Sequence, residues 1–150
     1  MARAGGVNGS DSHGRPRRRL VLHPQRPARP LPATSLTHDI AVLTALSNDV
    51  GFDVVFGRQL AAFAQAGDIA VGLYTNGGSS NVPRAFEEAS RFGMITVGLA
   101  GYDGGRMADA ETIDYFFVVP STSVHRIQEA QTTLCHVLWE LTQRALAPIT

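Results

Sequence analysis

Residues 69–74 read Ile-Ala-Val-Gly-Leu-Tyr, and residues 75–80 read Thr-Asn-Gly-Gly-Ser-Ser. The first stretch is apolar up to its tyrosine, which is typical of a strand buried on both faces of a parallel sheet. The second combines glycines with short polar residues and predicts a tight turn. A helix is expected over about 81–92, so the three segments form the strand, turn and helix of an α/β unit.

The same pattern continues downstream. Residues 94–99, Met-Ile-Thr-Val-Gly-Leu, form a second apolar run, and a glycine-rich segment at 101–105 follows it. Residues 115–119, Tyr-Phe-Phe-Val-Val, form a third run that Pro120 closes, and a long helix is expected over 123–147. Short apolar strands that alternate with helices predict an α/β fold, here a three-layer sandwich around a parallel sheet.

Two helices are expected before the first strand. Apolar residues at helical spacing predict a helix over 36–47, and a second helix is expected over about 52–66. Gly67 stands where a left-handed glycine would end this second helix. The folded domain is therefore expected to span residues 33–150.

Residues 1–32 differ in composition from the rest of the chain. They hold five of the eight prolines and seven arginines against a single acidic residue, whereas the remainder carries six arginines and twelve acidic residues. We expect a disordered basic head, because proline removes backbone donors and the only apolar cluster is Leu20–Leu22. A nucleic-acid-binding arm is the less favoured interpretation, since the head has no aromatic residue to stack on a base.

Composition restricts the class of protein. The chain has 150 residues, of which 44% are hydrophobic and 17% charged, as is ordinary for one soluble domain. No apolar run reaches the roughly 18–20 residues of a membrane span, and the first residues lack the apolar stretch of a secretory signal. The single cysteine, Cys135, excludes an internal disulfide. These features favour a cytoplasmic location without membrane attachment.

The turn at 75–80 is the candidate binding site. Ligands of open α/β sheets bind at the carboxyl ends of the strands, where this turn is expected. Gly77 and Gly78 allow a close backbone approach, and Thr75 and Ser79 supply hydroxyl groups. The backbone N–H groups of residues 77–80, at the start of a helix, suit a phosphate dianion. The alternative is a turn that only ends the strand and caps the helix.

Five stretches together resemble the phosphoheptose isomerase branch of the sugar isomerase (SIS) family. The most specific is Arg126–Glu129, Arg-Ile-Gln-Glu, with His136 eight residues beyond its glutamine. The order and spacing of the stretches match the family from about residue 30 to residue 146. Val119–Ser121 belongs to the same stretch as Arg126–Glu129, and the other four are Leu43–Asp49 with Gly51–Asp53, Phe56–Gln59, Gly67–Asp68 and Thr75–Val82.

The resemblance implies a SIS-type, flavodoxin-like sandwich that assembles as a homotetramer with active sites between subunits. Enzymes of this branch convert sedoheptulose 7-phosphate to an aldose phosphate, an early step toward the ADP-heptose of bacterial envelope sugars. This aldose–ketose isomerisation moves a proton between C1 and C2 through an enediol. A sugar phosphate is thus the implied ligand and zinc the implied metal.

The resemblance also assigns roles to individual residues. The implied substrate-binding residues are Asn48, Asp49, Thr75, Asn76, Ser79 and Gln128. His136 is the implied catalytic group, and Gln128 and His136 are the implied metal ligands; their spacing turns both to nearly the same side of a helix. Apart from the resemblance, His136 would be interpreted as a core or interface histidine, and Asn48 and Asp49 as helix-ending turn residues.

The chain departs from the family pattern within the phosphate loop and on the last helix. The loop is usually Ser-Thr-Ser-Gly-Asn-Ser, but here Tyr74 and Asn76 replace two serines and Gly78 replaces the asparagine. The bulky Tyr74 is expected to crowd a phosphate. Position 131, often histidine in the family, is Gln131.

The largest departure lies upstream. The family has a Gly-Asn-Gly-Gly-Ser loop and then a helix that carries a histidine and the acid/base glutamate, both metal ligands. This chain offers only Asn8–Ser10 and His13 there, and its first glutamate is Glu87. The first strand and helix are therefore expected to be missing or atypical, and isomerase activity to be weak or absent. Two alternatives stay open: a non-catalytic SIS module that binds phosphosugars, and a tetrameric SIS protein that binds a replication initiator.

Overall fold

The computed structural model describes residues 30–76 and 78–146. The chain divides into two units, Met1–Pro30 and Leu31–Thr150, and the elements described below belong to the second. The disordered head expected over residues 1–32 falls almost entirely outside the described residues and stays a prediction.

Three parallel strands form the sheet in the described part of the chain. They are β1 (Ile69–Leu73), β2 (Ile95–Gly101) and β3 (Tyr115–Val119), and their spatial order follows the chain order. Ile69 pairs with Ile95, and Val97 pairs with Tyr115, and both pairs of strands are parallel. The predicted parallel α/β sheet is confirmed, with β2 extending to Gly101, two residues beyond the expected end.

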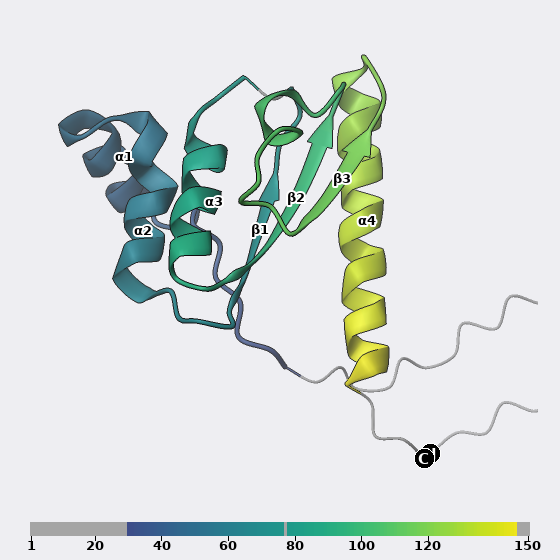
Figure 1. Ribbon diagram of the computed structural model, residues 1–150, viewed down its shortest axis with the longest axis horizontal. Helices are drawn as coiled ribbons and strands as arrows, with labels where there is room; N and C mark the ends of the chain where they lie inside the picture. The colour runs from purple at the N-terminus through teal and green to yellow at the C-terminus, as the bar shows by residue number, and fades with distance from the viewer. Residues whose placement is uncertain (1–29, 77, 147–150) are drawn as a thin grey trace, which may run out of the picture. The chain divides into compact units, whose positions relative to one another are not determined.

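Helices cover the sheet on two sides. They are α1 (Ile40–Asp49), α2 (Val55–Phe63), α3 (Asn81–Arg91) and α4 (Val124–Ala145). Figure 1 shows α1, α2 and α3 on one side of the sheet and α4 on the other, which makes the predicted three layers. Among the described residues, no helix is long and apolar enough to span a bilayer.

Two glycines mark the closest contacts between the sheet and its helices. A Cβ atom on Gly72 of β1 would lie 2.7 Å from Cζ of Phe86 on α3. A Cβ atom on Gly101 of β2 would meet the side chain of Ile127 on α4. Since alternate residues of a strand face opposite sides, Gly72 belongs to the face under α3 and Gly101 to the face under α4.

The first helix begins later than its apolar spacing predicts. Asp39 accepts a hydrogen bond from the Val42 N–H (3.0 Å) and caps α1, which therefore starts at Ile40 instead of residue 36. Leu36 precedes the helix and packs against the core cluster of Leu60 and its neighbours. The spacing of apolar residues alone could not show whether Leu36 lies within the helix or in the segment before it.

The second predicted helix is divided and shorter. A 3-10 turn, η1 (Phe52–Val54), leads into α2, which ends at Phe63. Gly67 adopts φ +89° as expected of a turn glycine, but it follows the helix by four residues and donates its N–H to the Gly93 carbonyl (3.0 Å). Its role is thus to shape the entry into β1, and the prediction that it ends α2 was wrong.

Buried side chains gather on both faces of the sheet. Leu60, Ala85, Ala89 and Met94 form a cluster that joins α2 and α3 to the start of β2. Ile127 of α4 is fully buried on the opposite side. α4 therefore packs on the sheet through one stripe of its surface. The same stripe approaches the carboxyl ends of the strands.

A hydrogen-bond network holds the start of β3 beside β2. The buried Thr96 donates its backbone N–H to Asp114 Oδ2 (2.8 Å), and the Asp114 N–H donates to Thr96 Oγ1 (2.9 Å). The same hydroxyl lies 2.8 Å from the Thr112 carbonyl and 2.9 Å from Asp114 Oδ2. The backbone bond first, and then the hydroxyl bond, lower the pKa of Asp114 below its usual value.

This network predicts an acid-sensitive contribution to stability. A carboxyl group whose pKa is lowered by folding stabilises the fold above its unfolded pKa of 3.8, and this contribution is lost as the pH falls below that value. Replacing Asp114 with asparagine should remove this part of the pH dependence. Free energies of unfolding in urea, measured from about pH 2 to pH 6, check the result. Thr96→Val should reduce the dependence of the unfolding free energy on pH only in part, because the backbone N–H of residue 96 still donates to Asp114. An unchanged acid slope in Asp114→Asn would contradict the assignment.

Candidate functional site

The loop between β1 and α3 lies at the carboxyl edge of the sheet, as the sequence predicts. Thr75 is half-buried, while Asn76 and Ser79 are exposed and free to meet a ligand. Gly77 lies outside the described residues. Three of the predicted phosphate-binding residues thus share one short segment that ends at the start of α3.

Gln131 fastens α4 to the ends of two strands. Its Nε2 donates to the carbonyls of Tyr74 (2.8 Å) and Leu99 (3.2 Å), and the residue is only 4% exposed. A buried amide with both donors bonded is costly to remove, since the Tyr74 carbonyl would lose its bond to Gln131 and the Leu99 carbonyl would keep only the bond from the Tyr74 N–H. Gln131 therefore fixes the position of α4 relative to the loop that begins after Tyr74.

In the sequence, Gln131 stands out only as a departure from the family pattern. A signal for its role was present, because the residue lies between Ile127 and Leu134 on the apolar stripe of the helix. A polar side chain in such a stripe points into the protein and must find partners there. The identity of those partners depends on tertiary structure.

Gly101 lets the loop come close to the sheet and to α4. A Cβ atom at this position would lie 2.5 Å from the Thr75 carbonyl oxygen and would also meet Ile127. Contacts this short do not occur between real atoms, so only glycine leaves room for the backbone of Thr75. The glycine-rich segment that sequence analysis identified thus has a direct part in forming the site.

Two loop amides already have acceptors inside the loop. The Ser79 N–H donates to the Tyr74 hydroxyl, and the Gly78 N–H donates to Asn76 Oδ1 (3.4 Å). Both acceptors belong to residues that replace family serines. Burial raises the pKa of Tyr74, an effect that the nearby Arg106 charge partly offsets, so the hydroxyl stays protonated at neutral pH. A phosphate that used these amides would have to displace two side chains.

Positive charge lies beside the loop. A surface pocket of about 360 Å³ adjoins Ser80, and two arginines reach it. Arg84 of α3 forms an ion pair with Asp53, whereas Arg106 lies within electrostatic reach of Tyr74. The pocket is lined by Ser80, Pro83, Arg84, Glu87, Arg106, Ala110 and Thr112. The role of Arg106 could not be predicted from the sequence, because its approach to the loop depends on the turn that follows β2.

Gln128 and His136 lie on α4, and both are exposed. They are the two implied metal ligands, one an amide and the other an imidazole. The described residues contain no group of three or more histidine, cysteine, aspartate or glutamate side chains that could hold a metal ion. A zinc site usually takes at least three protein ligands, so the described part of the chain does not by itself fit the implied metal.

Asn48 and Asp49 lie at the end of α1 with exposed side chains. Within residues 30–76 and 78–146, no hydrogen bond joins either of them to the loop at 75–80. The predicted phosphate ligands share one segment, whereas the two predicted sugar ligands lie on a separate helix. Their role in substrate binding stays a prediction.

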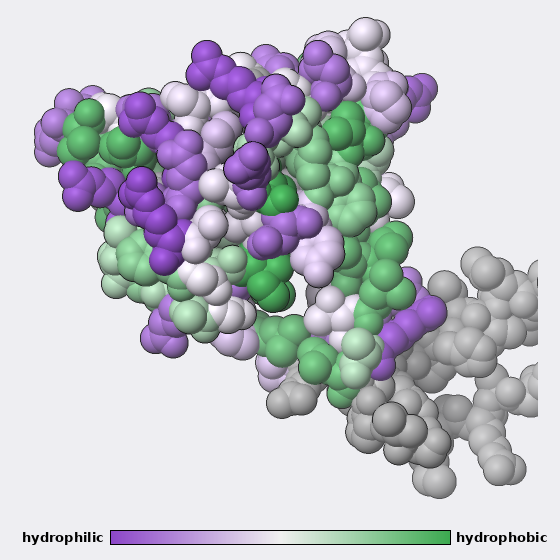
Figure 2. Space-filling model, viewed as in Figure 1, coloured by the Kyte–Doolittle hydropathy of each residue, from purple (hydrophilic) through white to green (hydrophobic). Residues whose placement is uncertain are grey.

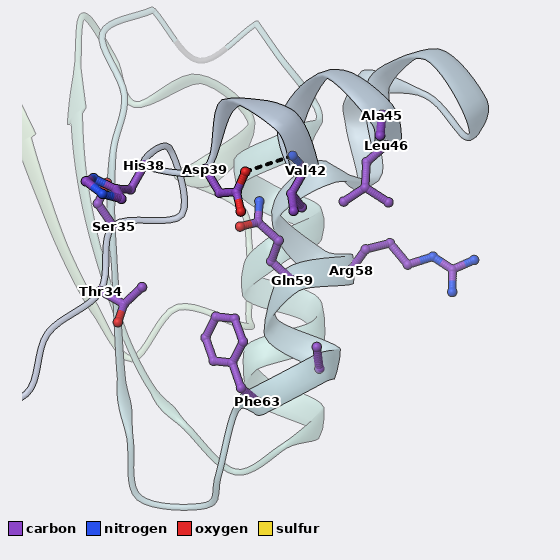
Figure 3. A pocket seen from close by; sticks show the side chains of 11 residues that line it. Thr34, Ser35, His38, Asp39, Val42, Ala45, Leu46, Arg58, Gln59 and Phe63 are labelled. Carbon is purple, nitrogen blue, oxygen red and sulfur yellow. Dashed lines mark hydrogen bonds between the residues drawn. The ribbon is translucent and has the colours of Figure 1, made fainter.

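A larger hollow lies elsewhere, between α1 and α2 (Figure 3). Its volume is about 650 Å³, and Phe63 contributes to its wall. Two of its polar side chains have structural partners: Asp39 caps α1, and Gln59 Nε2 donates to the carbonyl of Leu36 (3.1 Å). Arg58 extends outward from α2 in Figure 3. None of the predicted site residues lines this pocket.

Comparisons with known proteins point to one group of enzymes. No family model matches the sequence. The chain is 44% identical over 124 residues to the phosphoheptose isomerase of Aquifex aeolicus, which covers 83% of this chain and 64% of the relative. It is 48% identical over 118 residues to the phosphoheptose isomerase of Geobacter metallireducens, covering 79% of this chain and 61% of that relative.

Solved structures agree with the sequence matches. A phosphoheptose isomerase from Francisella tularensis superposes with a TM-score of 0.70 at 38% identity, over 74% of this chain and 61% of that one. The enzyme from Neisseria gonorrhoeae gives a TM-score of 0.68 at 39% identity, over 72% of this chain and 60% of that one. This chain spans about three fifths of the length of these relatives. Over that shared length, in sequence and in fold, the chain belongs to the phosphoheptose isomerase branch of the SIS family.

Proposed function

We propose that this chain carries the phosphate-binding and α4 portions of a sedoheptulose 7-phosphate isomerase. The observation that supports this most directly is the loop at 75–80, which places Thr75, Asn76 and Ser79 at the carboxyl end of β1. Arg106 adds positive charge beside it. Charge-assisted hydrogen bonds to a phosphate are about twice as strong as neutral ones, which suits such a loop for anchoring a phosphorylated sugar.

The proposed binding mode begins with displacement of the loop's own acceptors. The phosphate takes the Ser79 N–H from the Tyr74 hydroxyl, and it accepts from the hydroxyls of Thr75 and Ser79. Tyr74 then turns aside and can donate its own O–H to a phosphate oxygen. Asn48, Asp49 and Gln128 are proposed to contact the sugar. This assignment comes from the family resemblance.

The proposed chemistry is proton transfer between C1 and C2 through an enediol. Such a reaction needs one base and one acid near neutral pH, and His136 is proposed as one of the two. The second group is not among the residues that the resemblance assigns in this chain. No step is assigned to zinc, because the described residues do not complete a site for it. A cytoplasmic location, expected from the composition, and tetrameric assembly, implied by the resemblance, complete the proposal.

A non-catalytic phosphosugar-binding module is the second candidate. Its supporting observation is that the resemblance assigns only Gln128 and His136 of this chain to the catalytic centre, and both are exposed on α4. Such a module would bind the same ligand through the same loop, with no turnover. Binding and activity measurements on one preparation distinguish the two candidates.

The binding test compares sedoheptulose 7-phosphate with unphosphorylated sedoheptulose. Ser79→Ala removes a hydroxyl that donates to a charged group, and it should weaken binding of the phosphorylated sugar about tenfold. Isothermal titration calorimetry gives the dissociation constants. Ser90→Ala is the matched control, because Ser90 is an exposed serine at the other end of α3. Equal affinity for the two sugars, or equal losses in the two variants, would contradict phosphate binding by this loop.

A further inference from the structure

The loop at 75–80 offers a phosphate fewer free donors than the family pattern would. The Ser79 N–H already donates to the Tyr74 hydroxyl, and the Gly78 N–H donates to Asn76 Oδ1 (3.4 Å). Tyr74 and Asn76 stand where the family pattern has serine. A dianion bound to this loop would therefore be held more tightly if a neighbouring element supplied a further donor.

A neighbouring element reaches the loop through the surface pocket of about 360 Å³ that adjoins it. Ser80, the residue after Ser79, lines this pocket together with Arg106 of the 3-10 turn η2 (Gly105–Met107). Ser80 precedes α3, but its hydroxyl makes no capping bond to that helix. A hydroxyl and a guanidinium group thus share one cavity beside the proposed phosphate ligands.

The carboxyl edge of the sheet is also polar on its surface. Figure 2 shows hydrophilic side chains along much of the upper edge of the molecule, toward which the strand arrows point in Figure 1. Charged and hydroxyl-bearing residues line the pocket at this edge. Such a surface suits an ionic ligand better than an apolar one.

The Tyr74 hydroxyl marks a position that a phosphate oxygen would take. It accepts from the Ser79 N–H, which is one of the groups proposed to bind the phosphate. Burial raises the pKa of Tyr74, and the positive charge of Arg106 counteracts this by favouring negative charge on the same oxygen. A phosphate oxygen in that position would be stabilised by the same charge.

The turn that carries Arg106 is fixed to the sheet. Met107, the next residue, is 1% exposed, and a Cβ atom on Gly98 of β2 would lie 2.8 Å from its Cε atom. Gly104 adopts φ +90°, and its carbonyl accepts from the Met107 N–H (3.2 Å). The backbone on both sides of Arg106 is thus held in place, so a ligand that binds the guanidinium group need order only the side chain.

Arg106 also differs from the other arginine of the pocket in its partners. Arg84 forms an ion pair with Asp53, whereas no ion pair in the described part of the chain includes Arg106. Glu87 lines the same pocket and is exposed, and within the described residues it is not paired with either arginine. A guanidinium group without an acidic partner suits a phosphate, to which it can donate two parallel hydrogen bonds.

We propose that Arg106 binds the phosphate group of the sugar phosphate directly, with the Ser80 hydroxyl as a second donor. The guanidinium group donates to phosphate oxygens from the side of the pocket, while Thr75 and Ser79 donate from the loop. A residue outside the family's phosphate loop thus supplies the charge that holds the dianion in this chain. This inference rests on the proposed function, because it concerns the same bound phosphate.

The test measures dissociation constants of sedoheptulose 7-phosphate by isothermal titration calorimetry. Arg106→Gln removes the charge and should weaken binding about thirtyfold. Arg106→Lys keeps the charge without the forked geometry and should bind within about fivefold of the unmodified chain. Since salt screens exposed charges, the affinity of the unmodified chain should fall more steeply between about 0.05 and 0.5 M NaCl than that of Arg106→Gln. Both variants are expected to fold normally, because Arg106 is exposed.

Two further arginines serve as matched controls. Arg91 lies at the other end of α3, is exposed and is paired with Glu88, so Arg91→Gln should change the affinity less than about twofold. Arg84→Gln removes a charge from the same pocket, but one already paired with Asp53, and should weaken binding less than about threefold.

The outcomes separate this inference from the proposed function. Equal affinity of the unmodified chain for sedoheptulose with and without its phosphate would overturn the phosphate site itself. Clear preference for the phosphorylated sugar that Arg106→Gln leaves unchanged would keep the site and overturn only the role of Arg106. Equal losses in Arg84→Gln and Arg106→Gln, or equal salt dependence of Arg106→Gln and the unmodified chain, would also overturn direct binding by Arg106.

Discussion

Replacing Gly101 with alanine is expected to lower the free energy of unfolding by about 3 kcal/mol. The added Cβ would stand 2.5 Å from the Thr75 carbonyl oxygen and would press on Ile127 at the same time. Ile127 can change rotamer only within a fully buried site, and the Thr75 carbonyl is backbone. The clash of the added Cβ can therefore be relieved only if the 75–80 loop or α4 moves. Urea unfolding measures the resulting loss in the free energy of unfolding.

The same substitution should weaken ligand binding. Displacement of Thr75 moves a proposed phosphate ligand, so sedoheptulose 7-phosphate should bind Gly101→Ala more weakly than the unmodified chain. Gly67→Ala is the control, since nothing lies within 4 Å of the position of its Cβ. Its φ of +89° still makes alanine unfavourable by about 1–2 kcal/mol, without an effect on the loop. Equal losses of stability and equal ligand affinities in the two variants would show that close packing at Gly101 is unimportant.

Isomerase activity of the 150-residue chain is expected to be about a hundred- to ten-thousand-fold below that of the Aquifex aeolicus relative. His136 is the only proton-transfer group that the resemblance assigns in this chain, whereas the reaction needs both an acid and a base. Loss of one such group typically costs about this factor in rate. The measurement is conversion of sedoheptulose 7-phosphate by both proteins, side by side and with added zinc in parallel samples.

Binding measured on the same preparation separates slow chemistry from a damaged sample. A chain that binds sedoheptulose 7-phosphate but turns it over slowly fits the expectation and the non-catalytic candidate. Activity within about tenfold of the relative would contradict the expectation, because a second acid or base would then have to be present in this chain.

The strands could be predicted from the sequence because each is a short apolar run, although the end of β2 was placed two residues early. Residues 69–73 and 115–119 are followed by polar or proline residues, and their parallel pairing follows from the helices between them. The beginnings of the helices were harder to predict. Leu36 continues the spacing of α1, but the Asp39 side chain fixes the start of the helix at Ile40. Periodicity reports burial, whereas a cap depends on one local hydrogen bond.

The site could be predicted only in part, for a similar reason. The position of Thr75, Asn76 and Ser79 after β1 followed from the strand and turn pattern. The bonds from Ser79 to Tyr74 and from Gln131 to the strand ends did not, because they join groups that are set by the tertiary fold. Gln131 is 57 residues from Tyr74 along the chain. A sequence pattern can show that such a side chain needs partners, but not which carbonyls it will find.

The spatial order of the strands has a consequence for how the protein is made. Because β1, β2 and β3 neighbour one another in the order of synthesis, each new strand finds its pairing partner already translated. The helix that carries Gln131 and His136 comes after all three. Until this helix emerges from the ribosome, the carbonyls of Tyr74 and Leu99 lack the Gln131 donor. The face of the sheet that α4 contacts is then uncovered. During that interval the nascent chain is most exposed to chaperones and to aggregation, and for β2 and β3 the interval ends when α4 docks.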